Sequence, residues 1–175
     1  MSLSSDDLRA ANLAGSGALA IADRMRSAVS DAAGLDGSGP AALVALHLYA
    51  DGEGVDALAR ALTLSHSGAV RLVDQLVQRG LVRRTPSEHD RRAVAVRLTP
   101  AGRRAAQRVA TARHAALADV LAPLSPSERE RLGDLLGRVV AGQTHGHEDA
   151  RRVCRLCDAV ACGHPDRCPV TQAAR

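Results

Sequence analysis

The stretch "LSHSGAVRLVDQLVQRGLVRRTPSEHDRRAVAVRLTPAGR", residues 64–103, changes its hydrophobic period part-way along. In its first half, apolar residues recur at the three- and four-residue spacing of a buried helix face: Ala69, Leu72, Val73, Leu76 and Val77. Ser65 occupies the position of an N-cap, and Gly80 that of the residue after a helix end. We therefore predict a helix over residues 65–79.

The second half of this stretch has the alternating pattern of β-strands. The segments "LVRRT" (81–85) and "AVAVRLT" (93–99) flank the polar turn "PSEHDRR". In the second segment every other residue is a large aliphatic, so we expect Val94, Val96 and Leu98 to point inward. A hairpin directly after a helix of this kind predicts a wing beside that helix.

The segment "GVDALARAL" (54–62), just upstream, carries another apolar helix stripe. Its members are Val55, Leu58, Ala59 and Leu62. Two short amphipathic helices joined by a turn of a few residues are typical of a helix-turn-helix. With the hairpin added, the pattern predicts a winged helix-turn-helix.

Longer helical patterns flank this central unit. We expect helices over residues 6–33, from Pro40 to residue 50, from Pro100 (after a Thr99 cap) to about Leu121, and behind the capping box "SPSE" at 125–128. The apolar stripes Ile21–Val29 and Leu132–Val140 exceed what a compact winged core needs to bury. A twofold protein can also engage two half-sites about one DNA turn apart, so we predict a homodimer.

The predicted fold class is mainly α, with a winged helix-turn-helix domain, a small β-hairpin wing, and terminal helices that form a dimerisation region. The predicted divisions are N-terminal helices at 6–50, the winged domain at 51–99, C-terminal dimerisation helices at 100–148 and a cysteine-rich tail at 149–175.

Charge and aromatic content narrow the class of partner. All 23 basic residues are arginine, and the chain carries a net charge of +4. Nine arginines lie between Arg71 and Arg104, against Asp74, Glu88 and Asp90, which suits a phosphate backbone. The chain has no Trp or Phe and one Tyr, which argues against the aromatic base-stacking platforms of RNA and single-strand binders.

The helix over 65–79 has an outward face suited to duplex DNA. Its core stripe leaves His66, Ser67, Val70 and Arg71 facing out, in the half that enters the major groove in a helix-turn-helix. Arg71 suits a guanine edge, and Val70 suits a thymine methyl group. At the wing tip, Arg91 suits a narrow minor groove. A solvated polar surface is the alternative for each of these residues taken alone.

The passages "RLVDQLVQRGLVRR", "DRR" and "VRLTPAGR" resemble the multiple antibiotic resistance regulator (MarR) family of winged-helix repressors, over about residues 8–141. The resemblance implies a homodimer with interlocking first, fifth and sixth helices. It also implies two recognition helices and two wings on a pseudo-palindromic DNA site, and a small-molecule or oxidant signal that changes DNA affinity. The DNA-contacting positions carry over as Ser65, His66, Ser67, Val70, Arg71, Arg91 and Arg92. The family usually has Pro or Asn before the wing aspartate, where this chain has His89.

All four cysteines lie in "CRLCDAVACGHPDRCPV" (154–170), with the spacing C-x2-C-x4-C-x5-C. Four thiolates this close in sequence can surround one tetrahedral ion at metal–sulfur distances of about 2.3 Å. The segment has too few apolar residues to fold alone, so a metal would supply the missing free energy. We predict a structural Zn²⁺ held by Cys154, Cys157, Cys162 and Cys168.

Other interpretations of the cysteines stay open. The same thiolates suit an iron–sulfur cluster. Cys154 and Cys157 also suit a reversible redox pair, and a disordered tail with idle thiols is a further alternative. His164 can replace one cysteine, and His145 and His147 are close enough in sequence to contribute.

The remaining expectations concern location and activity. The sequence contains no run of about 18 uncharged apolar residues, so we predict no membrane span. The first residues lack a signal-peptide pattern, so we expect the protein in the reducing cytoplasm. We expect no catalysis, because no triad, paired carboxylates or Gly-rich phosphate loop is present. The rival functions are a thiol oxidoreductase using Cys154 and Cys157, and a metal-binding module whose winged domain contacts protein.

Overall fold

The computed structural model describes residues 4–87 and 94–175. Along the chain, the elements are α1 (Ser5–Ala33), α2 (Gly39–Ala45), the π-helical turn η1 (Leu46–Ala50), α3 (Val55–Leu62), α4 (His66–Gln78), β1 (Val82–Pro86), β2 (Val94–Leu98), α5 (Pro100–Leu121), α6 (Pro126–Gly142), α7 (His147–Val153) and α8 (Pro169–Ala173). The predicted mainly α fold with a winged helix-turn-helix and a hairpin wing is confirmed.

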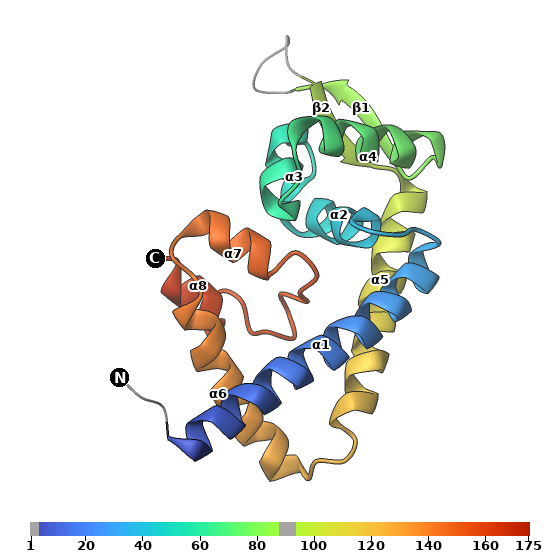
Figure 1. The fold of residues 1–175 in the computed structure, drawn as a ribbon. Coiled ribbons are helices and arrows are strands. Elements are labelled where there is room, and N and C mark those ends of the chain that lie inside the picture. The colour runs from blue at the N-terminus through green and yellow to red at the C-terminus, as the bar shows by residue number, and fades with distance from the viewer. Residues whose placement is uncertain (1–3, 88–93) are drawn as a thin grey trace.

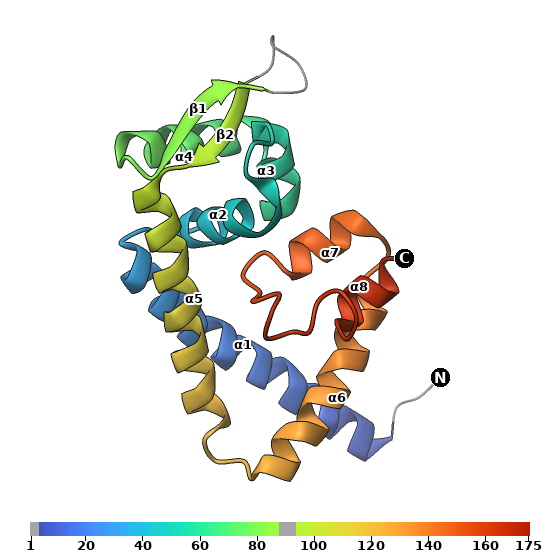
Figure 2. The same cartoon turned by 180° about the vertical axis from the view of Figure 1, so that it is seen from behind.

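The elements from α2 to β2 form a unit at one end of the molecule (Figure 1). The long helix α5 leaves the hairpin and runs away from this unit, with α1 packed along it. After a turn, α6 returns toward the unit, and α7 and α8 lie between α6 and α3, as the reverse view shows (Figure 2). Within the described residues, no helix is both long enough and apolar enough to cross a membrane.

Side-chain caps begin the helices where the sequence predicts them. Ser65, Thr99 and Ser125 each accept a backbone N–H three residues on, and Ser125 forms the predicted reciprocal capping box with Glu128. Each cap satisfies backbone donors that a helix start leaves unpaired, typically worth about 1 kcal/mol. The chain thus marks the starts of α4, α5 and α6 locally.

The core of the winged unit is made of aliphatic side chains from every one of its elements. Leu43, Leu46, Leu58, Leu76 and Leu98 are all fully buried. Burying one such side chain stabilises the fold by about 1.5–3 kcal/mol. A core of Leu, Val and Ala therefore suffices without Phe or Trp.

The inward face of β2 differs from the prediction. Ala95 is fully buried, whereas Val94 is 49% exposed. The N–H of Gly52 donates to the carbonyl of Val96, and the N–H of Val96 donates to the carbonyl of Glu53, both at 2.9 Å. The loop that contains Gly52 and Glu53 therefore covers the free edge of β2, and a small residue fits beneath it. Val94 pairs with Pro86 at the end of the hairpin that is farthest from α5.

Two predicted helix features also need correction. In α4, Ala69, Val73 and Leu76 are buried, but Val77 lies one position further round the helix and is 36% exposed. The helix expected to run to residue 50 is α-helical only to Ala45 and continues as the π-turn η1. The hydrophobic pattern alone does not distinguish an α-helix from a π-helical turn, because both keep a similar apolar face.

A glycine permits the close junction between β1 and α5. A Cβ atom at Gly102 would overlap the backbone carbonyl oxygen of Leu81. The same carbonyl accepts the Thr99 N–H at 3.0 Å, and the Thr99 hydroxyl donates to the carbonyl of Gly80 at 2.7 Å. The "TPAG" motif therefore ties the end of α4 to the start of α5.

Large apolar side chains stay exposed on the terminal helices. They are Leu8, Leu13 and Leu19 of α1, and Leu135, Leu136 and Val139 of α6. No residue of α6 is buried, and α6 packs against the short helix α8. The three exposed residues of α6 belong to the Leu132–Val140 stripe from which the sequence predicts a dimer. In the other predicted stripe, Ile21–Val29, Val29 is buried within the single chain, and the exposed leucines of α1 lie nearer the N-terminus.

Candidate nucleic-acid interface and the cysteine tail

The turn between α3 and α4 sets the direction of α4. Thr63 ends α3 in the left-handed conformation, with φ at 56°. A β-branched residue seldom adopts this conformation, so the packing of the two helices must hold it there. Ser65 then starts α4, its Oγ accepting the N–H of Gly68 at 3.1 Å.

One face of α4 is buried and the opposite face is open. Ser67 and Arg71 are exposed and Val70 is half-buried, on the side away from the buried Ala69 and Val73. The predicted outward face is therefore present in the described structure. It combines a cation, a hydroxyl and an apolar group, which are the groups that distinguish base edges in a major groove.

Two of the predicted contact residues also have partners inside the chain. The Nδ1 atom of His66 lies 2.6 Å from Oδ1 of Asp56 in α3, and the Ser65 hydroxyl serves as the α4 cap. Both side chains remain exposed, so these contacts orient the first turn of α4 without covering it. DNA contacts by Ser65 and His66 stay predictions.

The hairpin places an arginine pair that the sequence analysis did not single out. In the antiparallel register, Arg83 of β1 lies directly opposite Arg97 of β2. Two like charges directly opposite each other destabilise a strand pair when taken alone. Here the two arginines concentrate positive charge on one face of the wing. Strand register was the signal that could have found them. The predicted contacts Arg91 and Arg92 lie outside the described residues.

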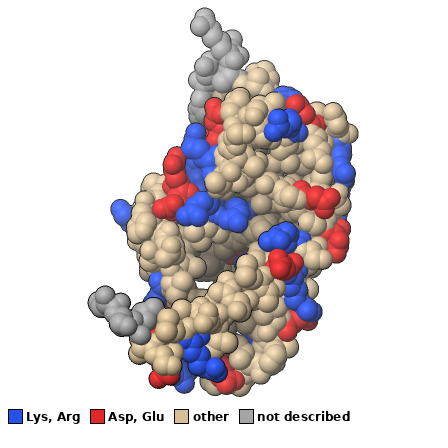
Figure 3. All heavy atoms as spheres, in the orientation of Figure 1, with Lys and Arg blue, Asp and Glu red and all other residues tan. Residues whose placement is uncertain are grey.

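Part of the basic cluster has a structural role. Arg84 binds Asp74 at 2.6 Å and joins β1 to α4, while Arg79 donates to the backbone carbonyl of Gly34. On the face shown in Figure 3, arginines and acidic residues are interspersed. The candidate interface is therefore confined to the open face of α4 and the hairpin.

The tail docks on the winged unit through polar contacts and one apolar side chain. The hydroxyl of Tyr49, in η1, donates to the carbonyl of Arg151 at 3.1 Å, and the Arg151 guanidinium lies over the Tyr49 ring. Glu148 of α7 pairs with Arg60 of α3 at 3.4 Å. Leu156 packs against both core clusters. Burial raises the pKa of Tyr49 to about 12.

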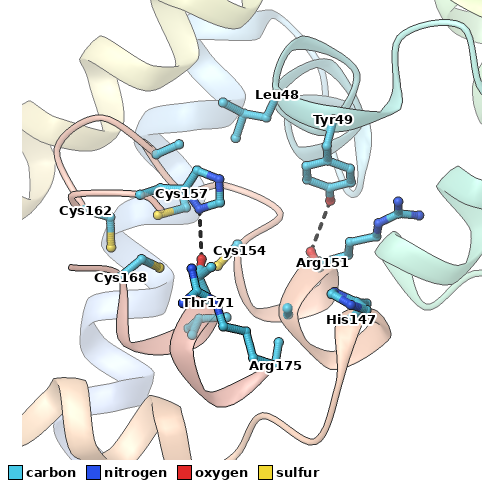
Figure 4. A pocket seen from close by; sticks show the side chains of 15 residues that line it. Leu48, Tyr49, His147, Arg151, Cys154, Cys157, Cys162, Cys168, Thr171 and Arg175 are labelled. Atoms are coloured by element: carbon cyan, nitrogen blue, oxygen red, sulfur yellow. Dashed lines mark hydrogen bonds between the residues drawn. The ribbon is translucent and has the colours of Figure 1, made fainter. Parts of the chain in front are cut away.

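The four cysteines line one cavity of about 390 Å³ between the tail and η1 (Figure 4). The Cys157 thiol donates to the backbone carbonyl of Asp158 at 3.5 Å, and the four thiols are near enough to influence one another's pKa. His164 and His147 line the same cavity. The Nδ1 atom of His164 lies 2.8 Å from the Thr171 hydroxyl. Sequence spacing and structure thus bring all four predicted ligands together.

These contacts differentiate the thiols. The hydrogen bond from Cys157 lowers the pKa of Cys154 and raises that of Cys157. Burial, with the neighbouring thiols, raises the pKa of Cys162 to about 12. Burial opposes ionisation of Cys168, but hydrogen bonds from Thr171 and Val170 lower its pKa overall.

The four thiols line one cavity but do not converge on one point. In the part of the chain that the structure describes, no three His, Cys, Asp or Glu side chains are already arranged to hold a metal ion. The predicted zinc site therefore stays a prediction at this stage.

Comparison with known proteins bears on the winged unit. A model of the MarR family matches residues 34–93, which hold α2 to β1 and the wing tip. The HTH-type transcriptional regulator PecS of Dickeya dadantii (strain 3937) is 38% identical over 82 residues. That match covers 47% of this chain and 49% of PecS, so the chain spans about half the length of this curated relative. Over residues 34–93, the chain is therefore similar to the MarR family of winged-helix transcriptional regulators.

Solved MarR-type structures extend the likeness beyond the winged unit. A MarR family protein from Bacillus stearothermophilus superposes with a TM-score of 0.68 at 25% identity, covering 79% of this chain and 96% of that chain. CouR from Rhodococcus jostii RHA1, in a structure bound to p-coumaroyl-CoA, has a TM-score of 0.59 at 26% identity, covering 79% and 95%.

The MarR match leaves the cysteines unexplained. The family model ends at residue 93, well before Cys154. The tail must therefore be interpreted from its own residues and contacts.

Proposed function

We propose that this chain is a MarR-type, sequence-specific transcriptional regulator that binds double-stranded DNA as a homodimer in the cytoplasm and represses the genes that it controls. The observation that carries the proposal is the capped helix α4, whose open face lies beside a hairpin wing. In winged and simple helix-turn-helix proteins, such a helix enters the major groove.

The residues divide by role. Arg71 reads a guanine, Val70 contacts a thymine methyl, and Ser67 and His66 contact bases or phosphates. Arg91 and Arg92 at the wing tip enter the minor groove, and Arg83 adds charge along the wing. Contacts to phosphate position the protein, whereas contacts to base edges give specificity.

A homodimer completes this arrangement. The exposed leucines of α1 and the exposed Leu135, Leu136 and Val139 of α6 are the surfaces that a second copy covers. Because a twofold dimer presents α4 twice, its DNA site is pseudo-palindromic.

The regulator also responds to a signal that changes its DNA affinity. CouR, a MarR-type neighbour, was solved with p-coumaroyl-CoA, which shows that a related fold holds a small molecule. For this chain, the signal is a small ligand, a metal ion or an oxidant.

Fluorescence anisotropy with labelled DNA from upstream of the chain's own gene tests the proposal. We expect binding whose affinity falls linearly with salt on a log–log scale, because arginines displace counterions from phosphates. Arg71→Ala should weaken binding by about 1–3 kcal/mol and relax specificity at one base pair of each half-site.

Arg9→Ala is the matched control. Arg9 is exposed in the first turns of α1, and the start of α1 lies at the end of the molecule away from α4 (Figure 1), so its loss removes the same charge without touching α4 or the hairpin. Salt-insensitive binding, or equal losses in the two variants, would contradict the proposal.

A further inference from the structure

The backbone of the tail already brings the four cysteines near one another. Cys154 caps the end of α7 and Cys168 caps the start of α8, so the two outer cysteines stand at helix ends. Between them, the N–H of Cys157 donates to the carbonyl of Cys154 at 2.9 Å, and the N–H of Cys162 to that of Asp158 at 3.0 Å. Gly163 turns the chain with φ at +71°, where a Cβ would press on Arg167.

Little apolar packing holds this loop together. Leu156 reaches the core, but Val160 is 89% exposed. The space beside the thiols is a cavity of about 390 Å³. A segment this short with so little buried surface usually needs a disulfide or a metal to be stable.

A half-buried cation on a neighbouring helix acts on the thiols. The positive charge of Arg113, in α5, acts on Cys154, Cys157 and Asp158. Its Nε atom is buried and has no hydrogen-bond partner among the described residues. Burying an unpaired guanidinium nitrogen is costly, so this position suits an anionic group in the tail. A divalent ion with four thiolates is a group of that kind, because its net charge is negative.

From this arrangement we propose that Cys154, Cys157, Cys162 and Cys168 bind one Zn²⁺ ion as thiolates, and that the ion holds α7 against α3. On binding, each thiol loses its proton to solvent and each sulfur donates an electron pair to the ion, with no change in oxidation state. Zn²⁺ favours four thiolate ligands in a tetrahedron.

The contacts of α7 connect this site to the DNA-binding helices. The ion fixes Cys154 at the end of α7, one helix length from the Glu148–Arg60 pair on α3. Arg151, also in α7, accepts the Tyr49 hydrogen bond. On the far side, α3 holds α4 through Asp56 and His66. This last step rests on the proposed function, because it assumes that α4 binds DNA.

Metal content of the whole chain, purified anaerobically in reductant, gives the first test. We expect one zinc per chain by elemental analysis and native mass spectrometry. After removal by a chelator, Co²⁺ should restore one ion per chain and give the visible absorption of tetrahedral cobalt thiolate. Brown absorbance from iron and sulfide, or a protein that takes up neither zinc nor cobalt, would overturn the proposal.

Substitutions separate the four cysteines from the nearby histidines. Cys157→Ser and Cys162→Ser should each lose tight metal binding. His164→Gln and His145→Gln are the controls, since both histidines lie in the tail, and both variants should keep one ion. Metal loss in His164→Gln with retention in either cysteine variant would overturn the four-thiolate site. Circular dichroism confirms that each variant keeps its helices, so that misfolding is not mistaken for ligand loss.

Tyr49 reports tail docking directly, because it is the single aromatic residue of the chain. Chelation should change its fluorescence as the contacts to Arg151 loosen, and added zinc should reverse the change. Cys162→Ser should show no response to either reagent. A wild-type Tyr49 signal that ignores zinc would overturn the link between the ion and α7.

DNA binding then separates this inference from the proposed function. Zinc-loaded protein should bind the upstream DNA about 5- to 150-fold more tightly than chelated protein, the usual range for coupled sites. Equal affinities would overturn the regulatory link. Zinc binding without any DNA binding would instead contradict the proposed function and leave the metal site standing.

Discussion

The winged unit and the cysteine tail both consist of short helices joined by tight turns, but different interactions hold them. Leucines and valines from every element of the winged unit share one core. The described tail, from His147 onward, buries Cys168 and Val170, packs Leu156 against the core, and otherwise relies on polar contacts and clustered thiols. A core stabilises a unit in proportion to the apolar area it buries, so a short, polar tail needs another source of free energy.

The largest expected effect comes from a substitution in the core of the winged unit, compared with a substitution in the tail. Leu76→Ala should lower the free energy of unfolding by about 2–5 kcal/mol, because it leaves a cavity in the winged core. Val160→Ala in the tail should change it by less than about 0.5 kcal/mol, since that side chain is exposed. Urea unfolding followed by circular dichroism measures both. Similar losses would mean that the tail also has an apolar core.

A second test compares the same substitution in the two regions. Thr99→Ala removes the α5 cap and the hydrogen bond to Gly80, and should cost about 0.5–2 kcal/mol of unfolding free energy. In Thr171→Ala, the lost partners are the exposed His164 ring and the weakly hydrogen-bonding Cys168 thiol, so the cost should be smaller. The same urea experiment applies, and a larger cost for Thr171→Ala would reverse the comparison.

The contact between the two regions can be weakened separately. Tyr49→Phe keeps the ring but loses the hydrogen bond to Arg151, which should cost the docked tail about 0.5–1.5 kcal/mol. Hydrogen exchange should accelerate in the α7 amides and stay unchanged in α4. Uniform acceleration in both helices would show that tail and winged unit open together.

The smallest expected effect is a pH dependence at the start of α7. The backbone N–H of His145, and then the side chain of Arg152, hold the pKa of Asp149 below its ordinary range. A depressed carboxyl pKa gives stability that is fully present above the unfolded value and is lost as pH falls through the folded value. Acidification below about pH 4 should therefore weaken the start of α7. NMR exchange of the α7 amides measures this, and Asp149→Asn should remove the dependence.

The sequence predicted much of the winged unit, because its signals are local. The caps at Ser65, Thr99 and Ser125 and the stripe through Val73 and Leu76 each depend on residues within a few positions. Such signals act whatever the rest of the chain does. The MarR resemblance rested on the same passages, and the comparisons confirm it.

The sequence predictions were wrong or incomplete where segments far apart in the sequence decide which side chains are buried. The Gly52–Glu53 loop covers β2 and makes Ala95, not Val94, the buried residue. The Arg83–Arg97 pair depends on strand register. At the candidate interface, the sequence placed Ser67 and Arg71 correctly on the open face, but it did not show that Asp56 engages His66.

By itself, the sequence determined the order of helices and strands, the starts of the capped helices and the grouping of four cysteines, because each follows from neighbours along the chain. Only the tertiary structure decided that the tail folds back on η1 and α3, that Tyr49 contacts Arg151, and that the charge of Arg113 acts on the thiols. Those contacts join residues about a hundred or about forty positions apart, as in the Tyr49–Arg151 bond across 102 positions. Their formation depends on how whole elements pack, which no local pattern records.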